Sequence, residues 1–580
     1  MNGYRIEPGG VRFLNLPETV EAVVADGREL PVDGAAAFVP GAAAGTRYQF
    51  RTRSGRLLPD PRTRFQPDGV HGPSEVIDPD AYAWQNNGWT GRPLDELVVY
   101  ELHVGTFTDA GTFAAGIEVL DELVALGVTA LELMPSSPAP GRWGWGYDGV
   151  SLFAVKEQYG RPDDLKAFVD AAHERGLCVI LDVVYNHFGP EGNYLAEFGD
   201  YFDKSVQTPW GAALNFAGPA RRYVVENARM WLEEYRVDGL RLDAVQFMYD
   251  ATDPPVTADI ARAAREVETA TGRRKLLFGE TNVYDHDLLR PLEEGGSGFD
   301  AVWCDDFLYA THHLLTGEQR IVRQFDGPAD LPDILCQGAI YDGPPGGRTR
   351  LMPDRVRKIT GGERLDLSRL VWSIQNHDLV GNDPHGRRMT EHASPEAHRA
   401  AAALMLLYPA VPLLFMGEEF ASRTPFHFFA DFGDEHLREA VVAGKRQEYA
   451  AFDWDDLICP TSADAFARSR RGRQKDGDAA MVAWYADLIA LRKRWRGLSL
   501  LTGDVMTVDV DPATDIYRIG YAGECGVVVR LTPNGKTHAD LSVGLPGEAV
   551  LSSVPCDGRS ATLGRHDAVA WERRANATAS

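Results

Sequence analysis

Short apolar runs alternate with longer amphipathic stretches from about residue 96 onward. Between several of the runs, apolar residues recur at helical spacing, for example in 163–175 and 220–235. Repeated alternation of strand and helix predicts a parallel sheet, and eight such units predict an α/β fold with a closed (β/α)8 TIM barrel. The eight expected strands are LVVYELHVG (from Leu97), VTALELMP (Val128), LCVILDVVYNH (Leu177), GLRLDAV (Gly239), LLFGET (Leu276), FDAVWCD (Phe299), LVWSIQNHD (Leu370) and VPLLFMGEEF (Val411).

The two ends of the chain carry a different pattern, in which short alternating segments are separated by turn residues. EAVVADG, AAFVPG and TRYQFRT predict an N-terminal immunoglobulin-like β-sandwich, and a Pro- and Gly-rich passage after them reads as a connecting loop. The helix expected at 479–495 closes the barrel, and VMTVDVDP, IYRIGYAG, GVVVRLTP and AVLSSVP predict a C-terminal β-sandwich. We therefore expect three domains, at residues 1–88, 89–496 and 497–580.

Composition and charge limit the kinds of molecule that this protein can bind. The 580 residues carry a net charge of −25, which disfavours binding to nucleic acid or to anionic membranes and favours a neutral substrate. The six cysteines are scattered singly, as expected of reduced, mostly buried thiols. MNGYRIEPGG lacks the apolar core of a signal peptide, and the most apolar stretch, 400–416, is broken by prolines and reads as a helix followed by a strand. We expect a soluble, cytoplasmic protein.

The fourth expected strand is interrupted by two charges. Arg241 and Asp243 lie two residues apart in an otherwise apolar run, so their side chains point to the same face of the strand. Burying both is costly unless they serve each other or a ligand.

Other polar residues follow the same pattern, because they stand at the carboxyl ends of expected strands, where barrel enzymes build their active sites. Three carboxylates from different strands, Asp243, Glu280 and Asp378, are expected to meet there. The full set of polar residues at these strand ends is Asp182, Asn186, His187, Arg241, Asp243, Glu280, His377 and Asp378.

Three converging acids are compatible with three kinds of site. They form a divalent metal site, a structural ion-pair network, or a pair of catalytic carboxylates. Arg241 already supplies the positive charge of a metal, so we favour glycoside hydrolysis. In this reading Arg241 keeps Asp243 ionised as the nucleophile, while the apolar LLF before Glu280 raises the pKa of that acid. Asp378 then binds sugar hydroxyls and stabilises the transition state.

Four segments carry a family resemblance: DVVYNH (182–187), GLRLDAV (239–245), GET (279–281) and QNHD (375–378) resemble the four sequence regions of the α-amylase superfamily of glycoside hydrolases. The resemblance implies α-glucosidic substrates and a retaining mechanism, with Asp243 as nucleophile, Glu280 as acid/base and Asp378 as transition-state stabiliser. It gives Asp182 and Asn186 a supporting role. The position equivalent to Asn186 binds an ion in calcium-dependent amylases, but no further acidic cluster lies nearby in the sequence, so we predict no metal and no cofactor.

Flanking segments narrow the resemblance to one family within the superfamily. PDPRTRFQPDGVHGPSEV, VVYNHFGPEGNYL, TPWGAALNF and PFHFFADF are similar to segments of the malto-oligosyltrehalose trehalohydrolases. That resemblance implies hydrolysis of the α-1,4 bond next to the terminal trehalose of a malto-oligosyltrehalose, giving trehalose and a maltodextrin. It also implies a pathway partner, malto-oligosyltrehalose synthase, without a stable complex. Two alternatives are a 1,4-α-glucan branching enzyme and a non-catalytic glucan-binding protein, although the latter usually lacks one of the three acids.

Aromatic residues near these strand ends are candidates for sugar binding. In the loop GRWGWGYDGVS, Tyr147 is expected to form the floor under the reacting sugar, because sugar rings stack on aromatic faces. Trp143 and Trp145 either join it or pack the loop. Asp148 orients Arg241, binds a hydroxyl or caps the turn.

Further contacts with the substrate are expected from the remaining strand ends. His187 and His377 offer hydrogen bonds to hydroxyls, and Trp210 is expected to contact the trehalose end. Phe426, Phe428 and Phe429 either line the cleft or belong to the core, and Glu418 and Glu419 are interpreted as acids that brace a loop.

Overall fold

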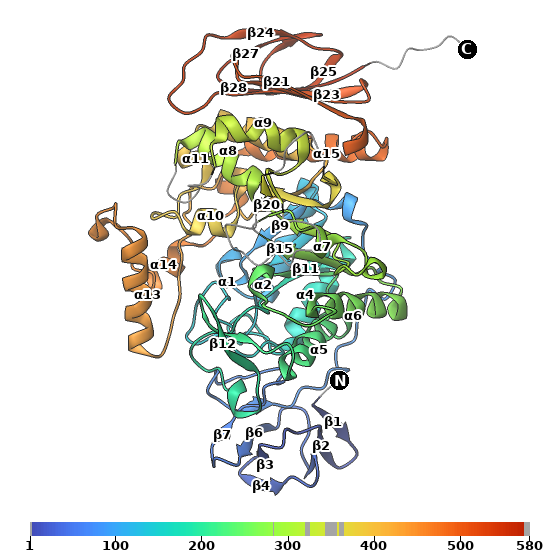
Figure 1. The fold of residues 1–580 in the computed structure, drawn as a ribbon, viewed down its shortest axis with the longest axis vertical. Coiled ribbons are helices and arrows are strands. Elements are labelled where there is room, and N and C mark those ends of the chain that lie inside the picture. The colour runs from blue at the N-terminus through green and yellow to red at the C-terminus, as the bar shows by residue number, and fades with distance from the viewer. Residues whose placement is uncertain (1–2, 282, 319–324, 343–356, 359–364, 574–580) are drawn as a thin grey trace.

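The structure is a computed structural model that describes residues 3–281, 283–318, 325–342, 357–358 and 365–573. A barrel occupies the middle of the molecule, with the N-terminal sheets at one end and the C-terminal sheets at the other (Figure 1).

Eight parallel strands close the barrel, as predicted. β20 pairs with β9, so the sheet has no free edge, and every strand is buried along nearly its whole length because both faces are covered. The strands are β9 (Val99–Leu102), β10 (Ala130–Leu133), β11 (Cys178–Val183), β14 (Gly239–Leu242), β15 (Leu276–Glu280), β16 (Ala301–Trp303), β19 (Leu370–Ser373) and β20 (Val411–Phe415).

The helices surround these strands, and the predicted ones are present. α4 and α5 begin with proline at the first helical position, where the missing N–H costs nothing. The longer helices are α4 (Pro162–Glu174), α5 (Pro219–Glu233), α6 (Val256–Thr271), α8 (Asp306–Thr316), α9 (Gly327–Gln337), α12 (Pro395–Leu406), α13 (Glu435–Glu448) and α15 (Ala479–Gly497). The shorter ones are α1 (Val104–Phe107), α2 (Phe113–Ile117), α3 (Leu120–Leu126), α7 (His286–Leu289), α10 (His377–Gly381), α11 (Met389–His392) and α14 (Ala463–Arg468).

Two antiparallel sheets pack face to face at the N-terminal end. Phe13 of one sheet lies against Tyr48 of the other, with ring centroids 4.7 Å apart. The passage expected to be only a connecting loop contributes β7 and β8, which both pair with β6, so that expectation was wrong at these four residues. The sheets are β1 (Tyr4–Glu7), β2 (Gly10–Leu14) and β5 (Ala36–Pro40), and β3 (Val20–Ala25), β4 (Arg28–Pro31), β6 (Arg47–Thr52), β7 (Leu57–Leu58) and β8 (Ser74–Glu75).

The C-terminal end also carries two antiparallel sheets, which share one apolar cluster. The larger sheet packs on α12 and α9 and thereby joins the barrel. It contains β21 (Met506–Asp511), β22 (Ile516–Tyr521), β23 (Cys525–Leu531), β25 (Glu548–Ser552) and β28 (His566–Glu572), and the smaller contains β24 (Leu541–Gly544), β26 (Cys556–Asp557) and β27 (Ser560–Leu563).

Two antiparallel strand pairs lie outside these sheets. One, β12 (Phe202–Thr208) and β13 (Gly211–Leu214), is inserted between β11 and α5, and the other pairs β17 (Tyr341–Asp342) with β18 (Arg357–Lys358). The apolar stretch 400–416 forms the end of α12 followed by β20, as predicted. Within the described residues no helix is both long enough and apolar enough to span a membrane.

The cysteines differ from expectation in their exposure. The six are not paired with one another in disulfides, as predicted, but Cys336 and Cys459 are exposed and Cys556 is half-buried, so only three of the six are buried.

Candidate active site

One arginine connects the acids at the carboxyl end of the barrel. Arg241, the third residue of β14, is only 1% exposed, and its Nη1 lies 2.9 Å from Asp243 Oδ1 and 2.8 Å from Asp182 Oδ2. Its Nη2 lies 2.9 Å from Glu280 Oε2. A single guanidinium therefore holds carboxylates from three neighbouring strands.

Both oxygens of Asp243 are engaged. Oδ1 contacts Arg241, and Oδ2 accepts a hydrogen bond of 2.8 Å from Asn186 Nδ2. The same amide donates to the backbone oxygen of Asp243 at 2.7 Å, so Asn186 fixes the carboxylate and its backbone together.

The turn after Asp243 is strained. Ala244 has a φ of 39°, in the left-handed region that residues with a Cβ rarely adopt. Its N–H then points at Glu280 and donates to Oε2 at 2.8 Å. The strained turn thus positions the second acid as well as the first.

Glu280 is adapted to carry a proton. Burial raises its pKa, Arg241 opposes that effect, and the negative charge of Asp243 reinforces it, leaving the pKa above the ordinary value. The direction agrees with the sequence-based expectation for a general acid.

A second hydrogen-bonded chain leads from His377 to Asp182. Burial alone would lower the pKa of His377, but the Glu101 carboxylate, in contact with its Nδ1, raises it to about 10. The opposite ring nitrogen, Nε2, lies 2.9 Å from the Tyr147 hydroxyl, which in turn donates to Asp182 Oδ2 at 2.8 Å. The Tyr147 and His377 rings are stacked, 5.2 Å apart. Tyr147 therefore joins the charged His377 to the carboxylates around Arg241.

Asp378 is the most exposed of the three predicted acids. Its side chain is 38% exposed, against 12% for Asp243 and 17% for Glu280. It stands in the first turn of α10, with Oδ1 3.5 Å from His377 Nε2. The carboxylate is thus available to a ligand entering from solvent.

His187 and Trp210 form a stacked pair at the rim. The rings lie 4.4 Å apart at 13°, and Trp210, in the turn between β12 and β13, is 46% exposed. Burial lowers the pKa of His187 to about 4, so its ring is neutral near pH 7. His187 Nε2 is 3.0 Å from the backbone oxygen of Tyr147, and Nδ1 contacts Asn186. The pair presents an open aromatic surface beside the acids.

Asp148 lies half-buried in the loop that carries Tyr147. Burial raises its pKa to about 6, and Lys156 is the charge that opposes this effect. Among the described contacts Arg241 has no hydrogen bond or ion pair with Asp148, so the geometry does not support the expected orientation of Arg241 by this residue.

The other aromatic candidates pack into the structure. Trp145 donates to the backbone oxygen of His427 at 3.0 Å and stacks on Phe426, and Trp143 stacks on Phe466. Phe426 and Phe429 are fully buried, whereas Phe428 is half-buried.

Glu418 and Glu419 have the bracing contacts that were expected of them. Glu418 accepts a hydrogen bond from Tyr485, and Glu419 accepts one from Tyr100.

Three acids near this site were not predicted: Glu101 and Glu132 are buried, and Asp305 is half-buried. Glu101 and Glu132 interrupt the apolar runs of β9 and β10 in the same way that Arg241 interrupts β14, and that signal was available in the sequence. Asp305 follows β16 and accepts a hydrogen bond of 2.9 Å from the indole of Trp303. Burial, together with the charges of Glu280 and Asp378, raises the pKa of Asp305 to about 8.

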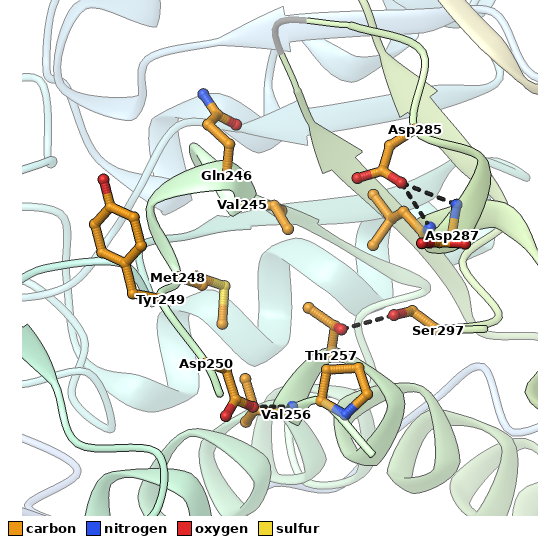
Figure 2. Close-up of a pocket in the computed structure, with 12 residues that line it drawn as sticks. Val245, Gln246, Met248, Tyr249, Asp250, Val256, Thr257, Asp285, Asp287 and Ser297 are labelled. Atoms are coloured by element: carbon orange, nitrogen blue, oxygen red, sulfur yellow. Dashed lines mark hydrogen bonds between the residues drawn. The ribbon is translucent and has the colours of Figure 1, made fainter. Parts of the chain in front are cut away.

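A separate pocket lies behind the 3-10 turn Val245–Phe247, which follows directly after Asp243 (Figure 2). Its walls include the apolar side chains of Met248 and Leu288, and the Thr257 and Ser297 hydroxyls are 2.7 Å apart across it. None of the three predicted acids lines this pocket.

Within the described part of the chain, no group of three or more His, Cys, Asp or Glu side chains is arranged to hold a metal ion.

Comparison with known proteins places this site in a family. A family model described as alpha amylase, catalytic domain, matches residues 79–210. A malto-oligosyltrehalose trehalohydrolase of Arthrobacter ramosus is 39% identical over 521 residues, covering 87% of each chain. A protein of the same name from Saccharolobus solfataricus is 39% identical over 487 residues, 82% of this chain and 83% of that one.

A solved structure, described as a putative alpha amylase from Salmonella typhimurium, superposes with a TM-score of 0.85 at 34% identity over 99% of both chains. By contrast, a 1,4-alpha-glucan branching enzyme of Pseudoalteromonas atlantica is 31% identical and matches only 50% of this chain and 46% of its own length. The chain belongs to the malto-oligosyltrehalose trehalohydrolase family of α-amylase-type glycoside hydrolases.

Proposed function

We propose that the protein hydrolyses the α-1,4-glucosidic bond next to the terminal trehalose of a malto-oligosyltrehalose, releasing trehalose and a maltodextrin. One observation carries the chemistry: Arg241 binds Asp243 with one terminal nitrogen and Glu280 with the other, each at 2.9 Å. Neighbouring nitrogens of one guanidinium keep the two carboxyl groups close together, and a short separation favours retention of configuration.

The first step uses the two acids in opposite protonation states. Glu280 donates its proton to the glycosidic oxygen, so trehalose leaves as a neutral alcohol. Asp243 attacks the anomeric carbon through one carboxylate oxygen and forms a glycosyl ester with the maltodextrin. The raised pKa of Glu280 keeps it protonated at a higher pH than an exposed glutamate. Arg241 holds the nucleophile Asp243 in place through the contact of 2.9 Å.

The second step returns both groups to their starting states. Glu280, now ionised, removes a proton from water. The resulting hydroxide attacks the anomeric carbon and breaks the ester to Asp243. The sugar product keeps the α configuration because the carbon has been inverted twice.

The remaining predicted residues bind or position the substrate in this proposal. Asp378, the most exposed acid, binds hydroxyls of the reacting sugar and stabilises its positive charge in the transition state. Tyr147 forms the floor of that sugar site, and Trp210 provides a stacking surface at the rim. The other residues in this group are Asp148, His187, Arg241 and His377 as substrate-binding residues, and Asp182 and Asn186 as supports of the site.

The alternatives are less well supported. A branching enzyme would transfer the glycosyl group to a glucan instead of water, but the branching-enzyme match spans only half of this chain. A non-catalytic glucan-binding protein has no need of the three acids, all of which are present.

The biological setting is part of the same proposal. We infer that the substrate comes from a malto-oligosyltrehalose synthase, with no stable complex between the two proteins, and that both act in the cytoplasm. We also propose functional domains at residues 1–88, 89–496 and 497–580, with catalysis in the second. No metal or cofactor is needed for the steps above.

Product analysis tests the proposal. The purified protein is incubated separately with maltotriosyltrehalose and with amylose, and the products are separated by chromatography. Free trehalose and maltotriose from the first substrate are the expected result. New α-1,6 branches in amylose, without any trehalose from the first substrate, would establish the branching activity instead.

A further inference from the structure

A pocket opens at the end of the barrel opposite the acids. It lies where β9 and β10 begin, between their preceding loops and the last two turns of α15. Val98, Val124 and Val128 form an apolar wall. Parallel strands place their carboxyl ends at the catalytic face, so this pocket is on the far face of the barrel.

The lining is basic although the protein as a whole is acidic. Five basic and two acidic side chains line the pocket, whereas the chain has a net charge of −25. Two of the cations are paired with carboxylates, Arg92 with Glu96 at 3.0 Å and Arg175 with Asp121 at 2.7 Å. The basic side chains are Arg92, Arg175, Arg492, Lys493 and Arg496, and the acidic ones are Asp95 and Glu96.

Within the described residues two of the cations have no carboxylate partner: Arg492 is buried and Arg496 is half-buried. Arg492 is 2% exposed and donates only to backbone oxygens, those of Leu406, Tyr408 and Ala410, at 2.6 to 2.9 Å. Arg496 contacts the backbone oxygen of Pro409, and its Nε is buried with no hydrogen-bond partner among the described atoms. Carbonyl oxygens satisfy hydrogen bonds but carry no net charge, so an anion at this position would be attracted.

Lys493 adds a third cation at the mouth of the pocket. Burial, together with the positive charge of Arg92, lowers its pKa. Within the described residues no carboxylate lies within ion-pair distance of its amine. The charge of Asp95 acts on Arg492 and Arg496, but among the described contacts Asp95 forms no ion pair with either. The excess positive charge is therefore shared by Arg492, Lys493 and Arg496.

We propose that this pocket binds a small phosphorylated metabolite, with the phosphate group between Lys493, Arg496 and Arg92. A phosphate brings up to two negative charges and three acceptor oxygens, which match an ammonium and two guanidinium groups. The valine wall accommodates the uncharged part of the molecule. The site is distinct from the glucan site, and its binding reaction does not depend on the proposed catalytic activity.

Isothermal titration calorimetry tests the site on the full-length protein. The probes are inorganic phosphate, pyrophosphate, glucose 6-phosphate and AMP, so that free phosphate, a sugar ester and a nucleotide are compared directly. At least one probe is expected to bind, more weakly at higher salt. Because a charge-assisted hydrogen bond contributes about 1.5–3 kcal/mol, Lys493→Ala should weaken binding by about tenfold or more.

Two further variants keep the test interpretable. Lys493→Arg retains the charge and should bind within a few-fold of the unchanged protein, whereas Lys475→Ala, which removes an exposed lysine elsewhere, should have no effect. Circular dichroism verifies that all three fold. The proposal is refuted if no probe binds at about 10 mM, which corresponds to a negligible affinity, or if Lys493→Ala binds as tightly as Lys475→Ala.

Discussion

Replacing Tyr147 by phenylalanine removes a single hydroxyl from the middle of the charged network. The hydroxyl lies 2.9 Å from His377 Nε2 and donates to Asp182 at 2.8 Å. The ring that stacks on His377, and that is proposed to support the sugar, stays in place in this variant. Tyr147→Phe therefore separates the hydrogen-bonding role of the residue from its stacking role.

The size of the effect follows from the two contacts. Each involves a charged partner, and a hydrogen bond to a charged group contributes about 1.5–3 kcal/mol. Asp182 keeps its contact with Arg241, but the charged His377 loses the acceptor of its Nε2 proton, and the next carboxylate is Asp378 at 3.5 Å. Losing one such contact in the transition state lowers kcat by about 10- to 100-fold.

Steady-state kinetics on maltotriosyltrehalose measure the effect. Tyr147→Phe should lower kcat with little change in KM, and Tyr147→Ala should also raise KM because the stacking surface is lost. Tyr223→Phe is a matched control, since the buried Tyr223 hydroxyl donates to the backbone oxygen of Pro61, far from the acids. That control should lose about 1 kcal/mol of stability and retain its kcat.

A kcat for Tyr147→Phe equal to that of the unchanged enzyme would show that the hydroxyl does not connect His377 to the reacting groups. An equal loss in Tyr223→Phe would contradict that connection, since the effect would come from general destabilisation.

Four other changes have defined outcomes. Glu280→Gln should lower turnover of maltotriosyltrehalose by about 10²- to 10⁴-fold but spare the first-turnover burst of fluoride from maltosyl fluoride, whose leaving group needs no proton. Later turnovers should be slow because Glu280 also activates water, and loss of the burst itself would remove Glu280 from the acid role. Asp243→Asn should abolish turnover with an unchanged circular dichroism spectrum, and near-normal activity would disprove the nucleophile assignment. In the folded protein the pKa of His377 is about 10, above the ordinary 6.5, so protonated His377 stabilises the folded state fully below about pH 6.5. This contribution is lost as the pH rises through 10. The free energy of unfolding measured in urea should fall over that pH range, and His377→Gln should make this fall smaller. Trp210→Ala should raise KM several-fold without lowering kcat, as measured by initial rates, and an unchanged KM would exclude a substrate contact.

The barrel could be predicted because buried parallel strands read as continuous apolar runs, and all eight runs became strands at the expected places. The strand register also placed Arg241 and Asp243 on one face, as the spacing of two residues requires. These features depend on local periodicity, which a single sequence contains.

The network around His377 could not be predicted, because its members come from distant parts of the chain. Glu101 precedes His377 by 276 residues, and only barrel closure brings them into contact. Asp305 is similar: nothing local distinguishes it from an ordinary helix-capping acid, and its raised pKa depends on Glu280 and Asp378, which other strands supply.

The position of Trp210 needed the tertiary structure for another reason. The sequence placed it in a long segment after the third strand, but the segment folds into the β12–β13 hairpin, whose turn lays the indole over His187. Trp210 therefore contacts His187 because of the hairpin, and the spacing of the two residues in the sequence does not predict this contact.

The proposed reaction is tested most directly by following maltotriosyltrehalose in the presence of the enzyme by proton NMR. We expect the trehalose signal to appear together with the α-anomer of maltotriose, before mutarotation produces the β-anomer. Appearance of the β-anomer first, or loss of substrate without trehalose, would contradict the proposed reaction.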